Sequence, residues 1–290
     1  MSLAASEFIL NIDGSIYHLN LLPENIAETI IVVGDPDRVD KVTAHFDSVD
    51  FKVRKREFHT QTGIYKGKRI SVISTGIGTD NIDIVFNELD ALVNIDFDSR
   101  SLKDKLTSLD IVRIGTTGSI QKDIPVDSFL LSEKGVGFDS LLHFYDSKHV
   151  QETELSRALM EHLQWPSQKS EPYAVNCDEE LAKKLSSDKV FKGITGTNVG
   201  FYGPQGRILR LPLQDPALNN KLESFSWNGQ KITNLEMETS GIYGLSKMLG
   251  HRAVSMNAVI ANRASGTFSK DPKKVVEELI SYCLEKLVAQ

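Results

Sequence analysis

Glu236 and Glu238 are two carboxylates placed where a predicted strand, residues 232–235, gives way to a predicted helix. Carboxylate oxygens accept hydrogen bonds from hydroxyl groups, so such a pair could hold the diol of a sugar. Acidic side chains near a helix N-terminus are also common because they complement the helix dipole. By itself the pair favours the second, purely structural interpretation.

Two arginines stand close to glycines, in patterns that can bind an anion. Arg113 lies inside an apolar predicted strand, residues 110–114, where a guanidinium is costly unless it is paired or meets an anion. We therefore place a functional role for Arg113 slightly ahead of a structural ion pair. Arg38 follows Gly34 in the segment GDPDR, where the glycine lets backbone N–H groups approach an oxyanion and the arginine can donate to it. A surface turn is the simpler interpretation of that segment.

The segment FYGPQGR, residues 201–207, joins an aromatic ring to an amide and a guanidinium. Phe201 could stack on a planar base while Gln205 and Arg207 form hydrogen bonds with its edge, because together they offer donors and an acceptor. A Gly-Pro loop with solvated polar side chains explains the same residues. Alone, the segment is a weak signal.

Strands and helices alternate along the chain, which favours an α/β sheet. Apolar residues with a 3.6-residue period predict a helix over residues 82–93, and we expect Asp80 or Asn81 to cap it. Further helices are expected at residues 153–163, 178–185, 237–249 and 275–288, and strands at residues 29–33, 69–74, 110–114, 128–132, 190–197, 232–235 and 253–261. Loops are expected at residues 34–37, 75–78 and 115–118, and strand ends of this kind are where open α/β sheets usually bind ligands.

The composition excludes several classes of protein. The chain has 290 residues, 25% of them charged, with a formal net charge of −6, which argues against a nucleic-acid or anionic-membrane binder. Gly76 and Gly78 lack the third glycine of a dinucleotide fingerprint, and no Walker A motif is present. Without a Gly/Ser/Pro-rich linker, we expect one domain over residues 1–290. Cys177 and Cys283 are too few for a disulfide framework, and with no secretory or membrane-spanning pattern we expect buried thiols and a cytoplasmic protein.

Taken together, these residues match the three parts of one set of ligands. The arginines suit a phosphate, the carboxylate pair suits the diol of a ribose, and residues 201–207 suit the edge of a nucleobase. On these segments the chain resembles the nucleoside phosphorylase superfamily, and within it the uridine phosphorylases. The segments that carry the resemblance are YHL (17–19), GDPDRV (34–39), REF (56–58), STGIG (74–78), RIGTTG (113–118), FYGPQGR (201–207), EME (236–238) and VIANR (259–263). The resemblance implies a three-layer α/β/α sandwich around a mixed central β-sheet.

The resemblance also implies roles for individual residues. Phosphate would be held by Gly34, Arg38, Arg56, Arg113 and Thr116, and ribose by His18, Glu236, Met237 and Glu238. The base would meet Phe201, Gln205, Arg207, Ile260 and Arg263, with Arg207, Gln205 and Arg113 as the catalytic set. His18 and Arg56 would come from a neighbouring subunit, so the protein would be a homo-oligomer, at least a dimer and in the bacterial pattern a hexamer.

The implied reaction is the reversible phosphorolysis of uridine, with deoxyuridine or thymidine as further substrates, to uracil and the sugar 1-phosphate. No metal or organic cofactor is implied, and inorganic phosphate is a co-substrate. Purine-cleaving relatives commonly place a Ser-Asp pair where this chain has Asn262 and Arg263, and arginine cannot serve as that general acid. A purine phosphorylase, a nucleosidase of the same fold and a catalytically silent nucleoside-binding protein remain alternatives. Residues 94–108 and 208–230 are longer than the bacterial pattern, and the second segment could lie near the pocket.

Overall fold

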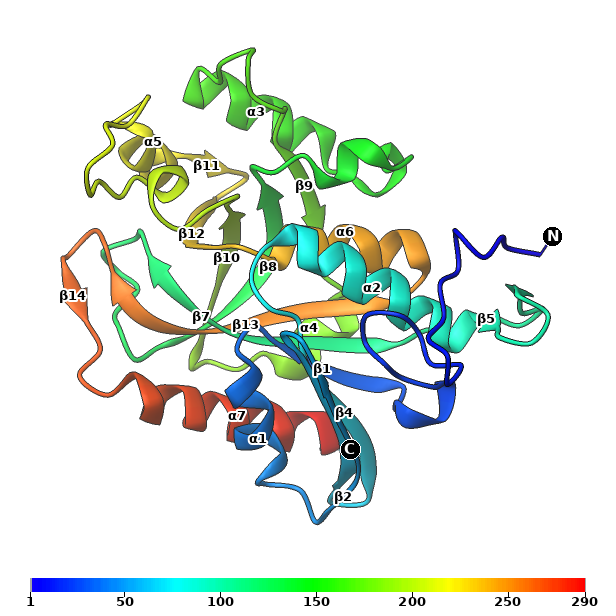
Figure 1. Cartoon of the computed structure of the whole chain (residues 1–290). Helices are drawn as coiled ribbons and strands as arrows, with labels where there is room; N and C mark the ends of the chain where they lie inside the picture. The colour runs from blue at the N-terminus through cyan, green and yellow to red at the C-terminus, as the bar shows by residue number, and fades with distance from the viewer. Residues whose placement is uncertain (1, 290) are drawn as a thin grey trace.

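A mixed β-sheet runs through the whole molecule and carries the residues of the site (Figure 1). The computed structural model describes residues 2–289. Its strands are β1 (Thr29–Val33), β2 (Ser48–Lys55), β3 (Phe58–Tyr65), β4 (Lys68–Ser74), β5 (Ile95–Asp96), β6 (Ser101–Leu102), β7 (Asp110–Ser119), β8 (Phe129–Gly137), β9 (Tyr173–Asn176), β10 (Val190–Thr197), β11 (Ser226–Trp227), β12 (Gln230–Glu236), β13 (Arg252–Asn262) and β14 (Thr267–Phe268). The strand order in the large sheet is β11-β12-β10-β8-β13-β7-β1-β4-β3-β2.

Strand β7 connects two parts of this sheet. It pairs in parallel with β1 on one side and with β13 on the other. Its last residues also pair antiparallel with β12, so that β7, β13, β8, β10 and β12 close into a ring. The closure brings the C-terminal end of β12 beside β7, although these strands are more than 100 residues apart in the chain.

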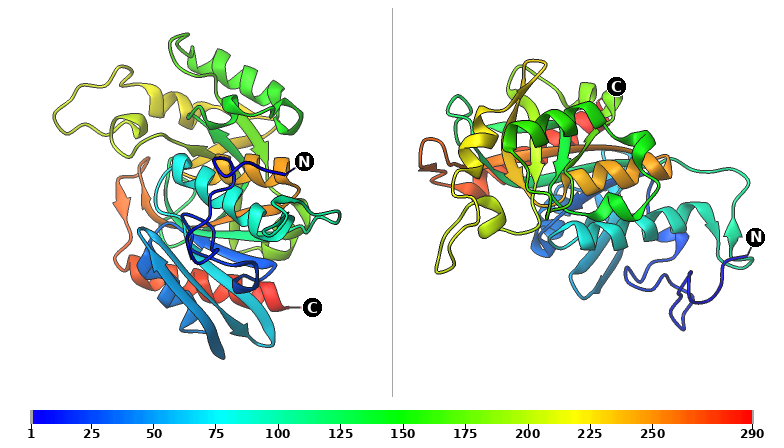
Figure 2. Two further views of the ribbon diagram at one scale, coloured as in Figure 1. Left: turned by 45° about the vertical axis from the view of Figure 1, so that its right-hand side comes forward. Right: turned by 90° about the horizontal axis from the view of Figure 1, so that it is seen from above.

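Helices cover both faces of the sheet (Figures 1 and 2). They are α1 (Pro36–Thr43), α2 (Thr79–Asn94), α3 (Thr153–Leu163), α4 (Glu179–Leu185), α5 (Leu218–Ser224), α6 (Thr239–Leu249) and α7 (Pro272–Val288), with short 3₁₀ turns at Pro23–Asn25, Leu141–Phe144, Lys148–Val150 and Gly203–Gln205. Helices α2 and α6 pack against each other over one face, while α1, α4 and α7 lie on the other. The expected α/β fold with a mixed central sheet between helical layers is therefore confirmed.

The apolar patterns in the sequence correspond to the buried faces. All five residues of β1 are buried, as a β-branched run inside a parallel sheet requires. Helix α2 buries the periodic residues Ile82, Val85, Phe86, Leu89 and Leu92. Cys177 and Cys283 are buried free thiols, as expected.

Three local predictions are wrong. The loop expected at residues 34–37 ends early, because Pro36 begins α1 and the Asp35 carboxylate caps it by accepting the N–H of Asp37. Residues 115–118 are not a loop but part of β7, since β13 and β12 supply ladder partners through them. Neither Asp80 nor Asn81 caps α2, whose N-cap residue is Gly78 with a φ of 97°.

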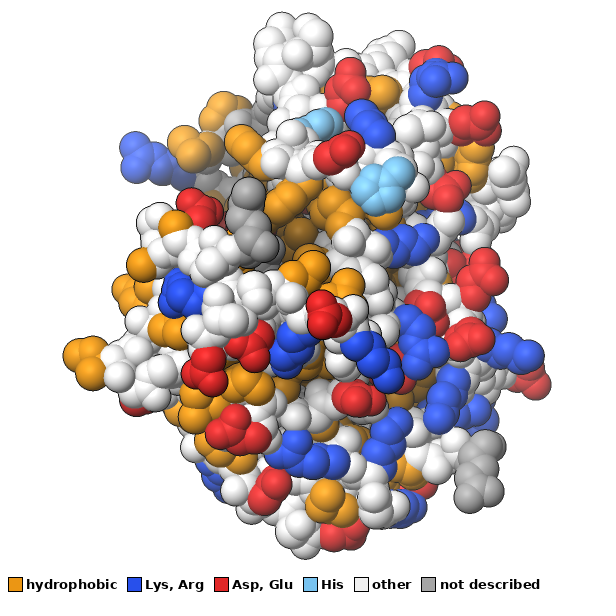
Figure 3. Space-filling view, turned by 90° about the vertical axis from the view of Figure 1, so that its right-hand side faces the viewer, with side chains coloured by type: hydrophobic (Ala, Val, Ile, Leu, Met, Phe, Trp, Pro, Cys, Tyr) orange, Lys and Arg blue, Asp and Glu red, His pale blue; other side chains and the backbone are white. Residues whose placement is uncertain are grey.

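The surface shows no single-sign charged region on the face drawn in Figure 3, where acidic and basic side chains are interspersed. Residues 94–108, which are longer than the bacterial pattern, include the short β5–β6 hairpin. Arg100 in its turn donates hydrogen bonds to the backbone carbonyls of Leu3 and Ala4, which ties the hairpin to the N-terminal segment. Between residues 2 and 289 no helix is both long and apolar enough to span a membrane.

Candidate active site

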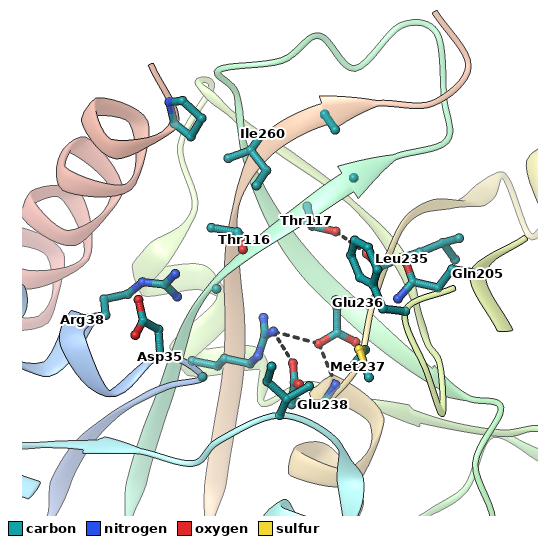
Figure 4. Close-up of a pocket in the computed structure, with 18 of the residues that line it drawn as sticks. Asp35, Arg38, Thr116, Thr117, Gln205, Leu235, Glu236, Met237, Glu238 and Ile260 are labelled. Atoms are coloured by element: carbon teal, nitrogen blue, oxygen red, sulfur yellow. Dashed lines mark hydrogen bonds and ion pairs between the residues drawn. The ribbon is translucent and has the colours of Figure 1, made fainter. Parts of the chain in front are cut away.

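A cavity of about 940 Å³ opens where β1, β7 and β12 deliver their functional residues (Figure 4). Arg38 lies on one side of it, Gln205 on the opposite side, and Glu236 and Glu238 lie between them. The expected site residues that line the cavity are Gly34, Arg38, Arg113, Thr116, Phe201, Gln205, Arg207, Glu236, Met237, Glu238 and Ile260. Tertiary folding thus brings together segments that the sequence separates by up to 226 residues, from 34 to 260.

The buried Arg113 is the hub of the cavity floor. One terminal nitrogen of its guanidinium lies 2.6 Å from Glu238 Oε2 and 3.1 Å from Glu236 Oε2. The other donates to Asn257 Oδ1 at 2.7 Å and to Ser255 Oγ at 3.3 Å, both on β13. Arg113, whose position in an apolar strand predicted an ion pair or a bound anion, is therefore paired with two carboxylates and also lines the cavity.

The two carboxylates have separate supports. Glu236 ends β12 and accepts hydrogen bonds from the hydroxyls of Thr197 and Thr239, at 2.7 and 2.9 Å. It also accepts the backbone N–H groups of Glu238 and Thr239, the first of α6, as expected for an acid at a helix N-terminus. Glu238 instead accepts the N–H of Gly78 at 2.9 Å and so connects α6 to the start of α2.

One guanidinium serves two carboxylates, so this buried cluster carries an excess negative charge. Burial raises the pKa of Glu238 above 4.5, with a further rise from the charge of Glu236, and Arg113 offsets only part of this effect. Burial acts to lower the pKa of Arg113, but the charges of Glu236 and Glu238 outweigh it and raise that pKa. Arg113 therefore stays charged, whereas Glu238 ionises less readily than a solvated carboxyl group.

The end of the cavity that suits an anion is formed by residues from β1, α1 and β7. Gly34 follows β1, and Arg38 on α1 donates to the carbonyl of Ile114 at 3.1 Å. Burial, together with the nearby charge of Arg113, lowers the pKa of Arg38. Thr116 projects from β7 between these groups and Ile260 (Figure 4). Two arginines thus converge on a space that a phosphate could occupy.

The opposite end is formed by residues 201–207. The guanidinium carbon of Arg207 lies 3.7 Å from the centre of the Phe201 ring, a cation–π contact. Arg207 also donates to Gln205 Oε1 at 2.7 Å and to the carbonyl of Phe201 at 2.6 Å. Because Gln205 Oε1 already accepts from Arg207, its Nε2 is the group that the amide can offer to a carbonyl oxygen of a bound base.

Three expected site residues do not line this cavity. His18 Nδ1 lies 2.6 Å from Glu88 Oε1, which accepts its hydrogen bond, and the His18 side chain is 26% exposed. Arg56 is exposed in the turn between β2 and β3, where its φ is 57°. Arg263 lies behind the base end and donates to the backbone carbonyl of Gln205.

Sequence reasoning missed several residues of the site. Asp35, Glu57 and Asn81 line the cavity, and Ser255 and Asn257 hold Arg113. A signal for the last two was present, because polar side chains at alternate positions of an otherwise apolar strand face the same side of the sheet. Asp35 and Glu57 lie in the GDPDRV and REF segments, but neither was singled out, since acids in turns are ordinary surface residues.

The family model described as the Phosphorylase superfamily matches residues 28–289. The chain belongs to this superfamily. Within residues 2–289, no group of three or more His, Cys, Asp or Glu side chains is arranged to hold a metal ion.

Relatives with assigned activities include both pyrimidine and purine enzymes. The chain is 30% identical to the uridine phosphorylase of Thermococcus kodakarensis over 271 residues, covering 90% of this chain and 83% of the relative. It is 27% identical to a DeoD-type purine nucleoside phosphorylase of Bacillus cereus, covering 94% and 99%. Among solved structures, a nucleoside phosphorylase from Trypanosoma brucei described as showing uridine phosphorylase activity superposes with a TM-score of 0.87 at 28% identity, covering 98% of this chain and 100% of that one.

Replacing Glu238 with glutamine is expected to change the pH dependence of stability. The pKa of Glu238 in the folded state lies above its ordinary value of 4.5, so this group favours folding at low pH and that contribution is lost as the pH rises. The free energy of unfolding of Glu238→Gln, minus that of the unchanged protein, should therefore increase between about pH 4 and about pH 8. Urea unfolding at a series of pH values measures this difference.

Glu285→Gln is the matched control, because hydrogen bonds from Lys66 and Tyr65 lower the pKa of Glu285. Its difference curve should slope in the opposite direction, with a small amplitude because the group is at the surface. A flat curve for Glu238→Gln would contradict the assignment of an unfavourably buried charge.

Proposed function

We propose that this protein catalyses the reversible phosphorolysis of uridine, giving uracil and ribose 1-phosphate. The observation that carries the proposal is the order of groups along one cavity: arginines at one end, paired carboxylates in the middle, and an aromatic ring with an amide and a guanidinium at the other. That order matches phosphate, ribose and base in a single bound substrate pair. The similarity to uridine phosphorylases in sequence and in structure supports the same activity.

Gly34, Arg38, Arg113 and Thr116 are assigned to phosphate, and Glu236, Met237 and Glu238 to ribose. In phosphorolysis an oxygen of phosphate forms a bond to C1′ while the bond from C1′ to the base nitrogen breaks. The bonding electrons leave with the base, whose anion then takes up a proton. Arg113 contacts both carboxylates and faces the phosphate end, so it can orient the nucleophile beneath the sugar that the acids hold.

Phe201, Gln205, Arg207 and Ile260 are assigned to the base. The guanidinium of Arg207 and the Nε2 of Gln205 supply donors where negative charge grows on the pyrimidine carbonyls. Their mutual hydrogen bond keeps the two donor groups together at this end of the cavity. The Phe201 ring offers a face for stacking once Arg207 shifts toward the base edge.

Pyrimidine is favoured over purine by residues 262 and 263. Asn262 is buried, and its amide donates to the carbonyls of Gln121 and Ile124. Arg263 follows it and cannot deprotonate usefully near neutral pH, so neither side chain can act as a general acid toward a purine nitrogen. Purine phosphorolysis is the second candidate, because DeoD-type relatives match along nearly the whole chain.

A neighbouring subunit is proposed to supply Arg56 and His18. The ionisable side chains that line the cavity of one chain are Arg38, Arg113, Arg207, Asp35, Glu57, Glu236 and Glu238, with acids in excess. A phosphate dianion therefore needs a further cation, and Arg56 is exposed at a hairpin tip outside its own cavity. We include in this proposal a homo-oligomer of at least two chains, with each chain a single domain, working in the cytoplasm with inorganic phosphate as co-substrate.

The central test is the release of uracil from uridine with and without inorganic phosphate, with thymidine and inosine assayed in parallel. We expect uridine cleavage to require phosphate, because a neutral water nucleophile would not need a cluster of arginines to bind it. Faster cleavage of inosine would make the protein a purine enzyme, and phosphate-independent cleavage would make it a nucleosidase. A folded protein that binds uridine without cleaving any nucleoside would be a silent binding protein.

Arg207→Ala is expected to lower kcat for uridine by about two to three orders of magnitude, the usual effect of removing one preorganised donor from a developing anion. Its melting temperature should change little, because the side chain is partly exposed and its bonds stay within one loop. Arg210→Ala is the control, since Arg210 is exposed three residues further along the same loop. Equal kinetics for the two variants would remove Arg207 from the base site.

Donation of Arg56 across an interface can be tested by complementation. Arg56→Ala and Arg38→Ala should each be nearly inactive alone. In a mixed dimer one of the two sites regains both arginines, so co-expression in equal amounts should restore about a quarter of the native activity. A co-expressed sample no more active than the better single variant would show that Arg56 acts within its own chain or not at all.

A further inference from the structure

Residues 208–230 follow the base end of the cavity and contain helix α5, to which the proposed reaction gives no role. The side chain of Asn219, on this helix, donates from Nδ2 to the backbone carbonyl of Gln205 at 3.1 Å. We propose that Asn219 is a positioning residue that holds Gln205 in register with the pyrimidine edge. This inference rests on the proposed function for its chemical meaning.

The Gln205 carbonyl is held from two sides. Arg263, just beyond β13, donates to it from the sheet, and Asn219 donates to it from α5. Between them lies the 3₁₀ turn Gly203–Gln205, whose Gln205 side chain is buried. The turn that presents the amide to the base is therefore clamped between the sheet and a helix from a distant part of the chain.

Gly206, which follows Gln205, shows how closely Asn219 approaches this turn. Gly206 has a φ of 70°, a conformation that favours glycine, and a Cβ at this position would collide with the amide nitrogen of Asn219. Asn219 Oδ1 is buried without a hydrogen-bond partner among the residues described. If the Asn219 side chain served packing alone, an amide would be unfavourable, because its buried oxygen has no hydrogen-bond partner. The functional group at this position is therefore the Nδ2 donor.

Helix α5 is itself well anchored, as a positioning element must be. Leu222, one turn from Asn219, is buried and packs in the apolar cluster that includes Leu155 and Leu159 of α3. Lys221 donates to Asp215 at 2.8 Å, and His162 of α3 lies 2.9 Å from the carbonyl of Lys221. Through Asn219 this rigidity passes to the backbone of Gln205.

Asn219→Leu removes the donor and keeps the branching and the number of non-hydrogen atoms of the side chain. Loss of one neutral hydrogen bond predicts a fall of roughly three- to tenfold in kcat/KM for uridine. The KM for phosphate should stay unchanged, because Asn219 touches none of the phosphate-site residues. The melting temperature should not fall, because Arg263 still pairs the Gln205 carbonyl and the unpaired oxygen is gone. Asn220→Leu, on the exposed side of the same helix, is the matched control with native kinetics.

Backbone hydrogen exchange tests the clamp independently of any activity. The N–H groups of Gln205, Gly206 and Arg207 donate within the turn, to Tyr202 and Gly203. In Asn219→Leu these amides should exchange about tenfold faster, and in Asn220→Leu at the native rate.

Unchanged exchange in Asn219→Leu would overturn the clamp, and faster exchange with native uridine kinetics would overturn the positioning role. If kcat/KM for uridine and the KM for phosphate worsened equally and the melting temperature fell, Asn219 would have a structural role only. If the unchanged protein cleaves no uridine, the proposed function fails, and the positioning role toward uridine falls with it, while the exchange experiment still decides whether the clamp exists.

Discussion

The pairing of Arg113 with Glu236 and Glu238 is the interaction on which the rest of the site depends. All three side chains are buried, and a charge in that position is tolerated only when its partners are in place. The partners come from β7, the end of β12 and the start of α6, so the ion cluster joins three elements at one point. The same three side chains line the cavity. Because each buried charge requires its partners, the ion cluster also fixes the position in which these side chains meet a ligand.

The ring closure of the sheet makes this cluster possible. Strand β12 reaches β7 only because the strands between them bend round, and the last residues of β7 then pair with Asn234 and Leu235 just before the carboxylates. Gly115 contributes within β7, because a Cβ at that position would collide with the guanidinium of Arg113. Glycine here allows close packing of an arginine on its own strand, while pairing with β13 and β12 makes the glycine-rich segment part of the strand.

The two ends of the cavity differ in how firmly they are built. The anion end rests on β1, β7 and α1, all parts of the sheet and its covering layer. The base end is a loop with hydrogen bonds of its own, and it is also held by groups outside it, namely Arg263 beyond β13 and Asn219 on α5. A loop held in this way can change its base preference by local substitutions while the phosphate and ribose ends stay intact, which suits a superfamily whose members act on different bases.

The sequence by itself determined the elements and the kinds of chemistry. The expected bounds of α3 and β10 are correct. Periodic apolar residues predicted α2 and α7 to within a few residues, because burial of one face dictates that spacing. The arginines, carboxylates and base-edge residues carried a resemblance that the family match bears out. Only the tertiary structure decided that Glu236 and Glu238 share Arg113, that Gly115 and Gly118 lie within a strand, and that Asn219 reaches Gln205. These facts depend on contacts between residues far apart in the chain, whose pairing follows from sheet closure and the packing of helices, which no local pattern encodes.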